Sequence, residues 1–135
     1  MIAGDVLGVS GPAATHTPII YAHLTVQSGT ELSIEIPADH QAGLYLFAGS
    51  ASVGAHQSQV AAHQLAVFAP GDGAVTITAP TNGEEATQAL LMAGRPLGEP
   101  VARHGPFVMN SRAELIEAVE DYQAGRMGTI APAGI

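Results

Sequence analysis

Residues 20–26 read IYAHLTV, and the alternation in this stretch decides the class of fold. Every second residue from Ile20 to Val26 is apolar, and the residues between them are Tyr, His and Thr. Successive side chains of a β-strand point to opposite faces of a sheet, so the stretch predicts a strand with one buried face. The same alternation recurs at 32–36 and at 75–79.

Denser apolar runs and closely spaced turn signals extend this pattern. The runs at 44–48 and 65–69 are almost wholly apolar, which predicts strands covered on both faces. Short Gly-, Pro-, Asn- and Asp-containing stretches separate the runs: Gln27-Ser28-Gly29, Pro37-Ala38-Asp39, Ala48-Gly49-Ser50, Pro70-Gly71-Asp72-Gly73 and Pro80-Thr81-Asn82-Gly83. Many short strands with turns at such spacing indicate an antiparallel sandwich or barrel.

Length, charge and composition limit the function. The 135 residues suit one domain, and the absence of Cys excludes disulfides and thiolate metal sites. The net charge is −8, and the four basic residues, all Arg, lie after residue 94. This balance argues against binding to nucleic acid and to anionic membranes. Because no signal peptide or membrane-span pattern is visible, we expect a soluble, cytoplasmic protein.

A helix is predicted near the C-terminal end. Ser111 followed by Glu114 has the spacing of a capping box, and Gly125 stands where a left-handed C-cap is expected. The helix should have about three turns. Its apolar stripe is expected to be Leu115, Ile116, Val119 and Tyr122. We expect the preceding loop, Gly105–Asn110, to be ordered and largely buried, with the Phe107 ring in the core.

Several segments resemble one known family. Residues Pro96–Gly128, PLGEPVARHGPFVMNSRAELIEAVEDYQAGRMG, resemble the ending of the pirins. Four shorter segments resemble other parts of the second pirin barrel: GVSGP at Gly8–Pro12, HTP at His16–Pro18, YLFAGSASV at Tyr45–Val53 and LAVFAPGD at Leu65–Asp72. The resemblance covers nearly the whole chain, and its terminal motif is long and specific.

The resemblance implies an all-β fold, the cupin-type double-stranded β-helix or jelly-roll barrel, with one short C-terminal α-helix. Residues 1–135 would form a single barrel like the pirin C-terminal domain. Within it, 1–18 would wrap the outside, 19–93 would supply the strands, and 94–135 would form a loop and the helix. Pirins have two barrels, so the chain would be a half-length relative or a fragment of a two-barrel pirin.

The resemblance also implies where a metal would bind. In pirins the metal, usually iron, is held by three His and one Glu of the first barrel, whereas this chain matches the second. Metal-binding cupins carry a His-x-His, a Glu before a Gly-turned hairpin, and a later His after a Pro-Gly turn. Counting from Gly49 and from Pro70-Gly71 places these ligands at Ala42 for the Glu, at Ile36 and Ala38 or Glu35 and Pro37 for the His pair, and near Ala74 for the last His. None of these positions holds the expected ligand type.

Other candidate groups are weak. The six histidines are His16, His23, His40, His56, His63 and His104, and no two are two residues apart. A non-standard cluster, such as His40 with His56 or His63, is the alternative to solvated or capping histidines. Asp72 reads as a turn former, and the adjacent Glu84 and Glu85 would face opposite ways on a strand. We therefore assign no catalytic, cofactor-binding or metal-binding residue and expect no cofactor.

Two functions from different classes follow. The first is a non-catalytic, metal-free structural or protein-interaction module, acting as a homodimer or with a pirin N-terminal cupin domain. The alternative is a small quercetinase-like cupin dioxygenase with a non-standard His metal site. A third reading is a small apolar ligand bound in the barrel mouth.

Overall fold

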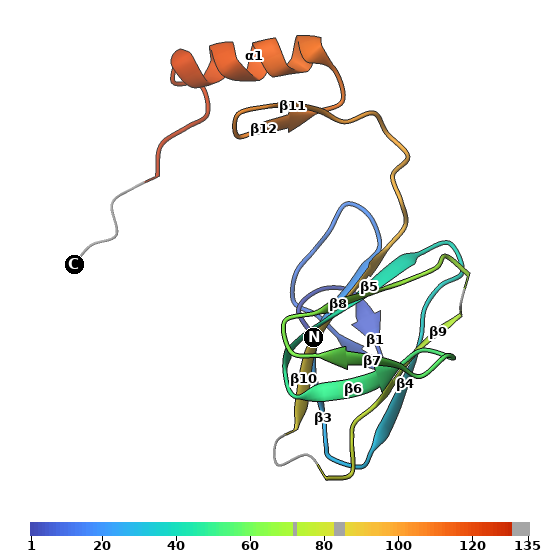
Figure 1. Cartoon of the computed structure of the whole chain (residues 1–135). Helices are drawn as coiled ribbons and strands as arrows, with labels where there is room; N and C mark the ends of the chain where they lie inside the picture. The colour runs from blue at the N-terminus through green and yellow to red at the C-terminus, as the bar shows by residue number, and fades with distance from the viewer. Residues whose placement is uncertain (72, 83–85, 131–135) are drawn as a thin grey trace, which may run out of the picture. The chain divides into compact units, whose positions relative to one another are not determined.

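The chain forms two compact units, Met1–Pro96 and Leu97–Ile135, called here the barrel unit and the terminal unit. The structure is a computed structural model, and it describes residues 1–71, 73–82 and 86–130 (Figure 1). The expectations for Asp72, Glu84 and Glu85 lie outside the described residues. No helix in the described residues is long and apolar enough to cross a membrane.

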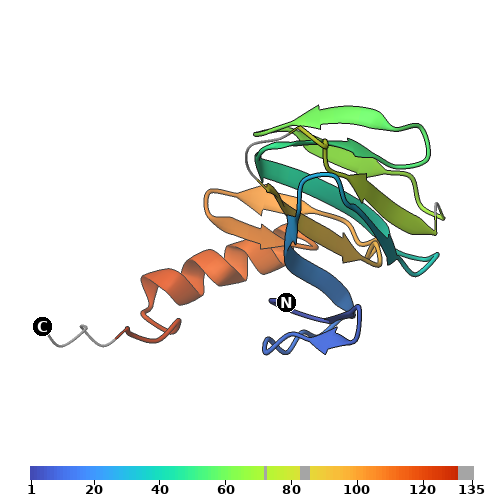
Figure 2. The same ribbon diagram turned by 90° about the horizontal axis from the view of Figure 1, so that it is seen from below.

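The barrel unit contains two four-stranded antiparallel sheets (Figures 1 and 2). The first sheet has the order β3 (Ile19–Val26), β10 (Thr87–Gly94), β5 (Gln41–Ala48), β8 (Leu65–Phe68). The second sheet has the order β4 (Glu31–Glu35), β9 (Ala74–Thr78), β6 (Ser50–Val53), β7 (Ser58–Ala61). From β3 to β6 the chain alternates between the two sheets, which is the jelly-roll arrangement. The expected all-β cupin fold with one short C-terminal helix is therefore confirmed.

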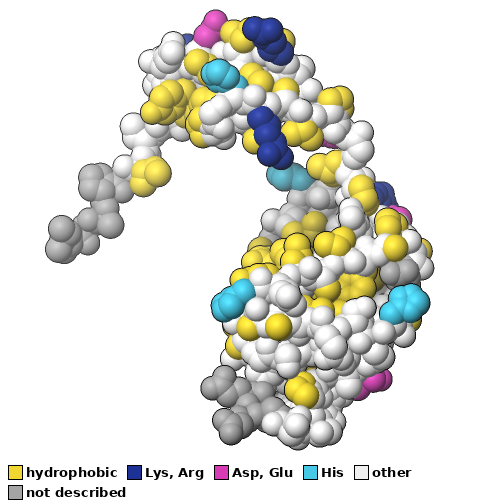
Figure 3. Space-filling view, viewed as in Figure 1, with side chains coloured by type: hydrophobic (Ala, Val, Ile, Leu, Met, Phe, Trp, Pro, Cys, Tyr) yellow, Lys and Arg dark blue, Asp and Glu magenta, His cyan; other side chains and the backbone are white. Residues whose placement is uncertain are grey.

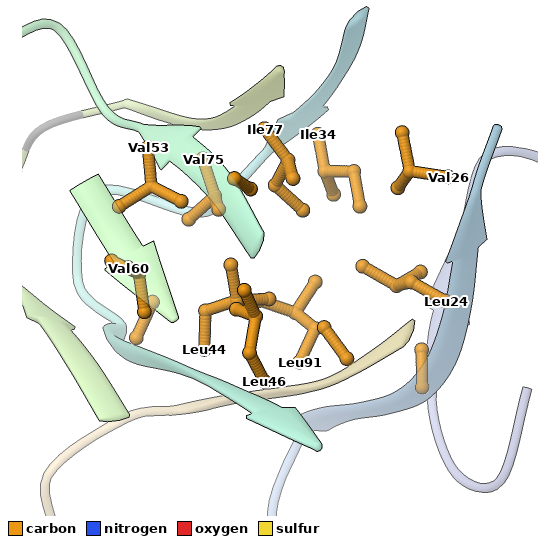
Figure 4. Packing of buried hydrophobic residues seen from close by; sticks show 14 of the residues in the cluster. Leu24, Val26, Ile34, Leu44, Leu46, Val53, Val60, Val75, Ile77 and Leu91 are labelled. Carbon is orange, nitrogen blue, oxygen red and sulfur yellow. The ribbon is translucent and has the colours of Figure 1, made fainter. Parts of the chain in front are cut away.

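The hydrophobic core lies between the two sheets (Figure 4). The apolar residues of the alternating stretch 20–26 are all buried, as are those of 75–79. Leu44 and Leu91 of the first sheet and Ile34 and Ile77 of the second are fully buried. The period-two pattern therefore identified the inward face of these strands correctly.

The dense apolar runs are not covered on both faces, contrary to the expectation. In β5, Tyr45 and Phe47 are half-buried on the face opposite the core. In β8, Leu65 and Val67 are 54% and 64% exposed. The runs are continuous because the outer face of the first sheet is also apolar, although these side chains remain accessible.

The N-terminal segment lies along the edge strand β3. Ala3 is buried and pairs with Tyr21, and the segment continues into a small hairpin of β1 (Asp5–Val6) and β2 (Val9–Ser10). Gly4 has a φ of +77°, and a Cβ there would lie 1.8 Å from the carbonyl oxygen of Ile19. Only glycine allows this close approach between the two backbones.

The terminal unit is a hairpin followed by a helix. The hairpin pairs β11 (Ala102–His104) with β12 (Phe107–Met109), and α1 spans Arg112–Gln123. The predicted capping box is confirmed: the backbone N–H of Glu114 donates to Ser111 Oγ, and the backbone N–H of Ser111 donates to the Glu114 carboxylate. The Ser111 hydroxyl also donates to the Glu114 carboxylate, and this bond, together with those from the backbone N–H groups of Ser111 and Asn110, lowers the pKa of Glu114. Gly125 has the expected positive φ, +70°.

Two expectations for this unit were wrong. The buried residues of α1 are Leu115 and Ala118, whereas Ile116 and Tyr122 are 53% and 66% exposed. The segment expected to be a buried loop is a β-hairpin turn and strand whose residues are exposed or half-buried. Phe107 is half-buried, and its ring meets the ring of Tyr122 edge-on at 6.2 Å. A hairpin and one helix enclose too little volume to bury a larger set.

The capping box makes a first prediction. Ser111→Ala should destabilise α1 by about 1 kcal/mol because one N-terminal N–H loses its acceptor. Hydrogen exchange of the α1 amides measures this, and Ser111→Thr, which keeps the hydroxyl, is the matched control. The lowered pKa of Glu114 means that its contribution is present above the unfolded glutamate pKa and is lost as pH falls through the folded pKa. Equal α1 protection in wild type and Ser111→Ala would contradict the assignment.

The aromatic contact makes a second prediction. Phe107→Ala should cost about 1–2 kcal/mol, less than the 3–5 kcal/mol typical of a fully buried ring, because Phe107 is only half-buried. In a double-mutant cycle with Tyr122→Ala, the coupling should be about 0.5–1.5 kcal/mol. Additive effects of the two substitutions would show that the ring pair contributes nothing.

Candidate functional site

Some of the ligand positions inferred for a cupin metal meet at one cavity of the barrel unit. Ile36, Ala42 and Ala74 line this cavity together with Pro37 and His40, whereas Glu35 and Ala38 do not, so one residue of each expected His pair is present. They come from the segment after β4, from β5 and from the start of β9. Counting along the sequence thus identified positions that are neighbours in space. The cavity has a volume of about 10 Å³, enough for about one water molecule.

The residues at this cavity do not fit a metal ion. Ile36 and Ala42 are buried aliphatic side chains, and the remaining described lining residues other than His40 are likewise apolar or glycine. In the described part of the chain, no group of three or more His, Asp or Glu is placed to hold an ion. The cavity is also too small for an organic ligand, so the third reading gains no support here.

Among the described residues that line the cavity, His40 has the one polar side chain, and it follows directly after the turn segment Pro37-Ala38-Asp39. It is 6% exposed, and its Nδ1 lies 2.8 Å from Asp39 Oδ1. Arg95 donates from Nε to Asp39 Oδ2 at 2.7 Å. The hydrogen bonds with His40 and Arg95 lower the pKa of Asp39. The three side chains form an Arg–Asp–His network at the rim of the barrel.

The inward position of His40 had a signal in the sequence. Residues 40, 42, 44 and 46 share one parity, and the last three are the inward residues of β5. Continuing the alternation one step before the strand places His40 on the core side. The turn residues Pro37 to Asp39 obscured this continuation.

The other histidines lie at the surface. His23 is on the outer face of β3, as expected, with its ring 5.3 Å from the Phe47 ring and its Nε2 3.1 Å from Gln88 Oε1. His63 has a φ of +68° in the turn after β7. His16, His56 and His104 are also exposed. The alternative was a metal site formed by His40 with His56 or His63. Among the described residues, no group of three or more possible metal ligands includes His40.

The outer face of the first sheet carries apolar side chains on all four of its strands. The register places Met92 of β10 between Tyr21 and Gly43, and Leu90 between His23 and Tyr45. It extends to the edge strand β8, where Leu65 is opposite Tyr45 and Val67 is opposite Gly43. Hydrophobic side chains are also visible on the side of this unit that faces the viewer in Figure 3.

Comparisons with known proteins agree with this fold. The chain is 37% identical to Pirin-1 of Arabidopsis thaliana over 130 residues, which cover 95% of this chain and 45% of that protein. It is 31% identical to human Pirin over 130 residues, 95% of this chain and 44% of that protein. The chain thus spans less than half the length of these curated relatives.

A solved structure has a similar fold. A crystal structure described as quercetin 2,3-dioxygenase from Acinetobacter baumannii superposes with a TM-score of 0.83 at 28% identity, covering 96% of this chain and 43% of that one. The family model of the pirin C-terminal cupin domain matches residues 21–128. The chain therefore belongs to the pirin C-terminal cupin domain family.

Proposed function

We propose that this chain is a metal-free cupin barrel that acts as a structural and protein-interaction module. Its partner is a second cupin barrel, either a pirin N-terminal cupin domain or a second copy of this chain. The module supports the partner barrel and contributes no catalytic group.

The observation that carries the proposal is the set of aliphatic residues at the ligand positions. Ile36, Ala42 and Ala74 converge on a cavity of about 10 Å³. A metal site needs several nitrogen or oxygen donors directed at one point. Here the same positions extend the hydrophobic packing toward the barrel rim, and His40 is engaged with Asp39.

The outer face of the first sheet supports the interaction role. This sheet face carries Leu65, Val67, Leu90 and Met92, and exposed apolar side chains grouped on one face are typical of an interaction site. A second barrel with the same kind of face would cover it, and two-fold pairing is the commonest arrangement of identical chains.

The alternative is a quercetinase-like dioxygenase, which the similar structure from Acinetobacter baumannii favours by its description. The chain covers 43% of that protein, so the similarity does not by itself assign the activity to this part. The dioxygenase reading requires a His site of a kind that the described residues do not bring together.

Metal analysis separates the two functions. Protein prepared without a metal-affinity tag should hold far less than one iron, nickel, copper or zinc per chain, and it should consume no oxygen with quercetin. His40→Gln should leave the metal content unchanged, because among the described residues His40 belongs to no group of three or more possible metal ligands. Near-stoichiometric metal that disappears in His40→Gln would establish the alternative.

Sedimentation equilibrium tests the interaction face. At micromolar concentration the chain should show twice its 13.7 kDa mass, and Leu65→Glu or Val67→Glu should shift it towards one chain. Both side chains are more than half exposed, so a charge there should not unfold the barrel.

Val9→Glu is the matched control for this face. Val9 is 55% exposed, close to the 54% of Leu65, but it lies in the N-terminal hairpin. The Val9 variant should keep the mass of the parent. A mass of one chain at every concentration, with no partner barrel supplied, would rule out the homodimer.

A further inference from the structure

The strand β8 is an edge of the first sheet, and its sequence does nothing to protect that edge. The edge strand β3 pairs with the N-terminal segment at Ala3, and the edge strand β4 carries the exposed carboxylates of Glu31 and Glu35. The edge strand β7 carries the polar residues Ser58 and Gln59. β8 reads Leu-Ala-Val-Phe, without a charged or polar side chain, a glycine or a proline. An edge of this kind is a template for pairing with another strand.

The backbone of β8 has hydrogen-bonding groups that point to the free edge. Its neighbour in the sheet is β5, and the backbone N–H of Leu46 donates to the carbonyl of Gln64, directly before β8. Because the backbone groups of alternate residues point to the same side of a strand, those of Ala66 also point to β5, and those of Leu65 and Val67 point away from it. Within the described part of the chain, no hydrogen bond from outside the sheet reaches the N–H or C=O groups of these two residues.

The free edge is accessible to a further strand. A groove of about 670 Å³ lies beside it, and all four residues of β8 line this groove. The opposite lining comes from β7 and from the segment before it. Leu65 and Val67 are 54% and 64% exposed. The partner that such an edge accepts is an extended strand, which supplies main-chain hydrogen bonds.

We propose that the strand that covers this edge is β8 of a second copy of the chain. The two strands pair antiparallel about a two-fold axis at Ala66, which joins the first sheets of both copies into one continuous sheet. Opposite residues of an antiparallel pair share a face, so Leu65 lies opposite Val67 of the second copy. In this register the N–H and C=O groups of both residues bond to those of the second copy, and no free group of β8 is left over.

The side chains fit the same register. On the outer face, Leu65 lies beside Val67 of the second copy, so apolar groups meet and no charges are opposed. On the inner face, the two Ala66 side chains meet at the axis, where the Cα atoms are about 4.5 Å apart and a small residue is needed. An axis at Leu65 would pair Val67 with His63, whose φ of +68° is not that of a strand. An axis at Val67 would pair Leu65 with Ala69, which lies past the end of β8.

This inference rests on the homodimer of the proposed function and specifies how the two copies meet. The contact is the edge of the sheet, made by backbone groups, and the outer face of the sheet stays open to a partner cupin barrel. A homodimer formed through the outer face would instead depend on side chains, including those of the central strand β10. Substitutions and amide exchange therefore distinguish the two arrangements.

Hydrogen exchange of the full chain, followed by NMR over a range of protein concentrations, tests the backbone bonds. The amides of Leu65 and Val67 should exchange rapidly in dilute protein and slowly once the dimer forms, because they then donate to the second copy. The amide of Ala66 should be protected at every concentration, because it points to β5. Contact through the outer face would leave the Leu65 and Val67 amides free to exchange in the dimer.

Val67→Pro tests the same bonds by sedimentation. Proline removes the N–H that points to the free edge but no bond to β5, and proline is tolerated on edge strands for this reason. The mass should fall from two chains to one. Val67→Ala, which keeps the N–H, should retain the mass of two chains. Met92→Glu, on the outer face of β10, should also retain it.

Ala66→Cys tests the position of the axis, because the chain has no other cysteine. Two residues opposite each other at about 4.5 Å between Cα atoms are close enough for a disulfide. With oxidised glutathione, Ala66→Cys should crosslink into dimers. Val9→Cys, which is 55% exposed in the N-terminal hairpin, is the control and should crosslink much more slowly.

Two outcomes would overturn the inference, and they differ in what they say of the proposed function. If the mass of two chains persists in Val67→Pro and is lost in Met92→Glu, with rapid exchange of the Leu65 and Val67 amides, the homodimer stands and its contact is the sheet face. If the parent has the mass of one chain at every concentration, both the edge pair and the homodimer are wrong. The pairing with a pirin N-terminal cupin domain is then still open to its own test.

Discussion

The packing of one sheet against the other is the constraint on which the barrel unit depends. Leu44 and Leu91 of the first sheet meet Ile34 and Ile77 of the second in a layer that excludes water (Figure 4). No disulfide reinforces this layer, because the chain has no cysteine. Each strand must therefore keep its apolar residues in one register, since a slip of one residue would turn them to the outer face.

The same packing accounts for the chemistry at the barrel rim. A metal-binding cupin interrupts its core with polar ligands, which are costly to bury unless an ion or a hydrogen bond compensates them. In this chain, Ile36, Ala42 and Ala74 continue the aliphatic core to the rim, and His40 is the one polar side chain among the described residues that line the cavity there. Its contact with Asp39, which Arg95 also holds, satisfies one ring nitrogen and fixes the turn before β5.

The sequence predicted the features that depend on local spacing. The alternation at 20–26 identified inward side chains, and the Ser111–Glu114 pair identified the first turn of α1, because strand and cap geometry are set by neighbours in sequence. The positions Ile36, Ala42 and Ala74 followed from counting within a known fold.

The remaining features depend on what lies opposite a residue in space. The run at 65–69 looks like a doubly covered strand, but nothing in its composition says whether a partner covers its outer face. The prediction of which residues α1 buries was wrong for a similar reason. A hairpin of three-residue strands can bury Leu115 and Ala118 but not Ile116 and Tyr122, and the sequence does not state the size of the docking surface.

The terminal unit buries little apolar surface of its own. A unit of about forty residues seldom supplies enough buried area for its own stability. Here the buried apolar residues of the helix are Leu115 and Ala118 alone. Any molecule that binds the folded unit and not the unfolded chain stabilises it in proportion to its concentration over its dissociation constant. A partner that covered Ile116 or Tyr122, which are 53% and 66% exposed, would therefore add to the stability of the folded unit.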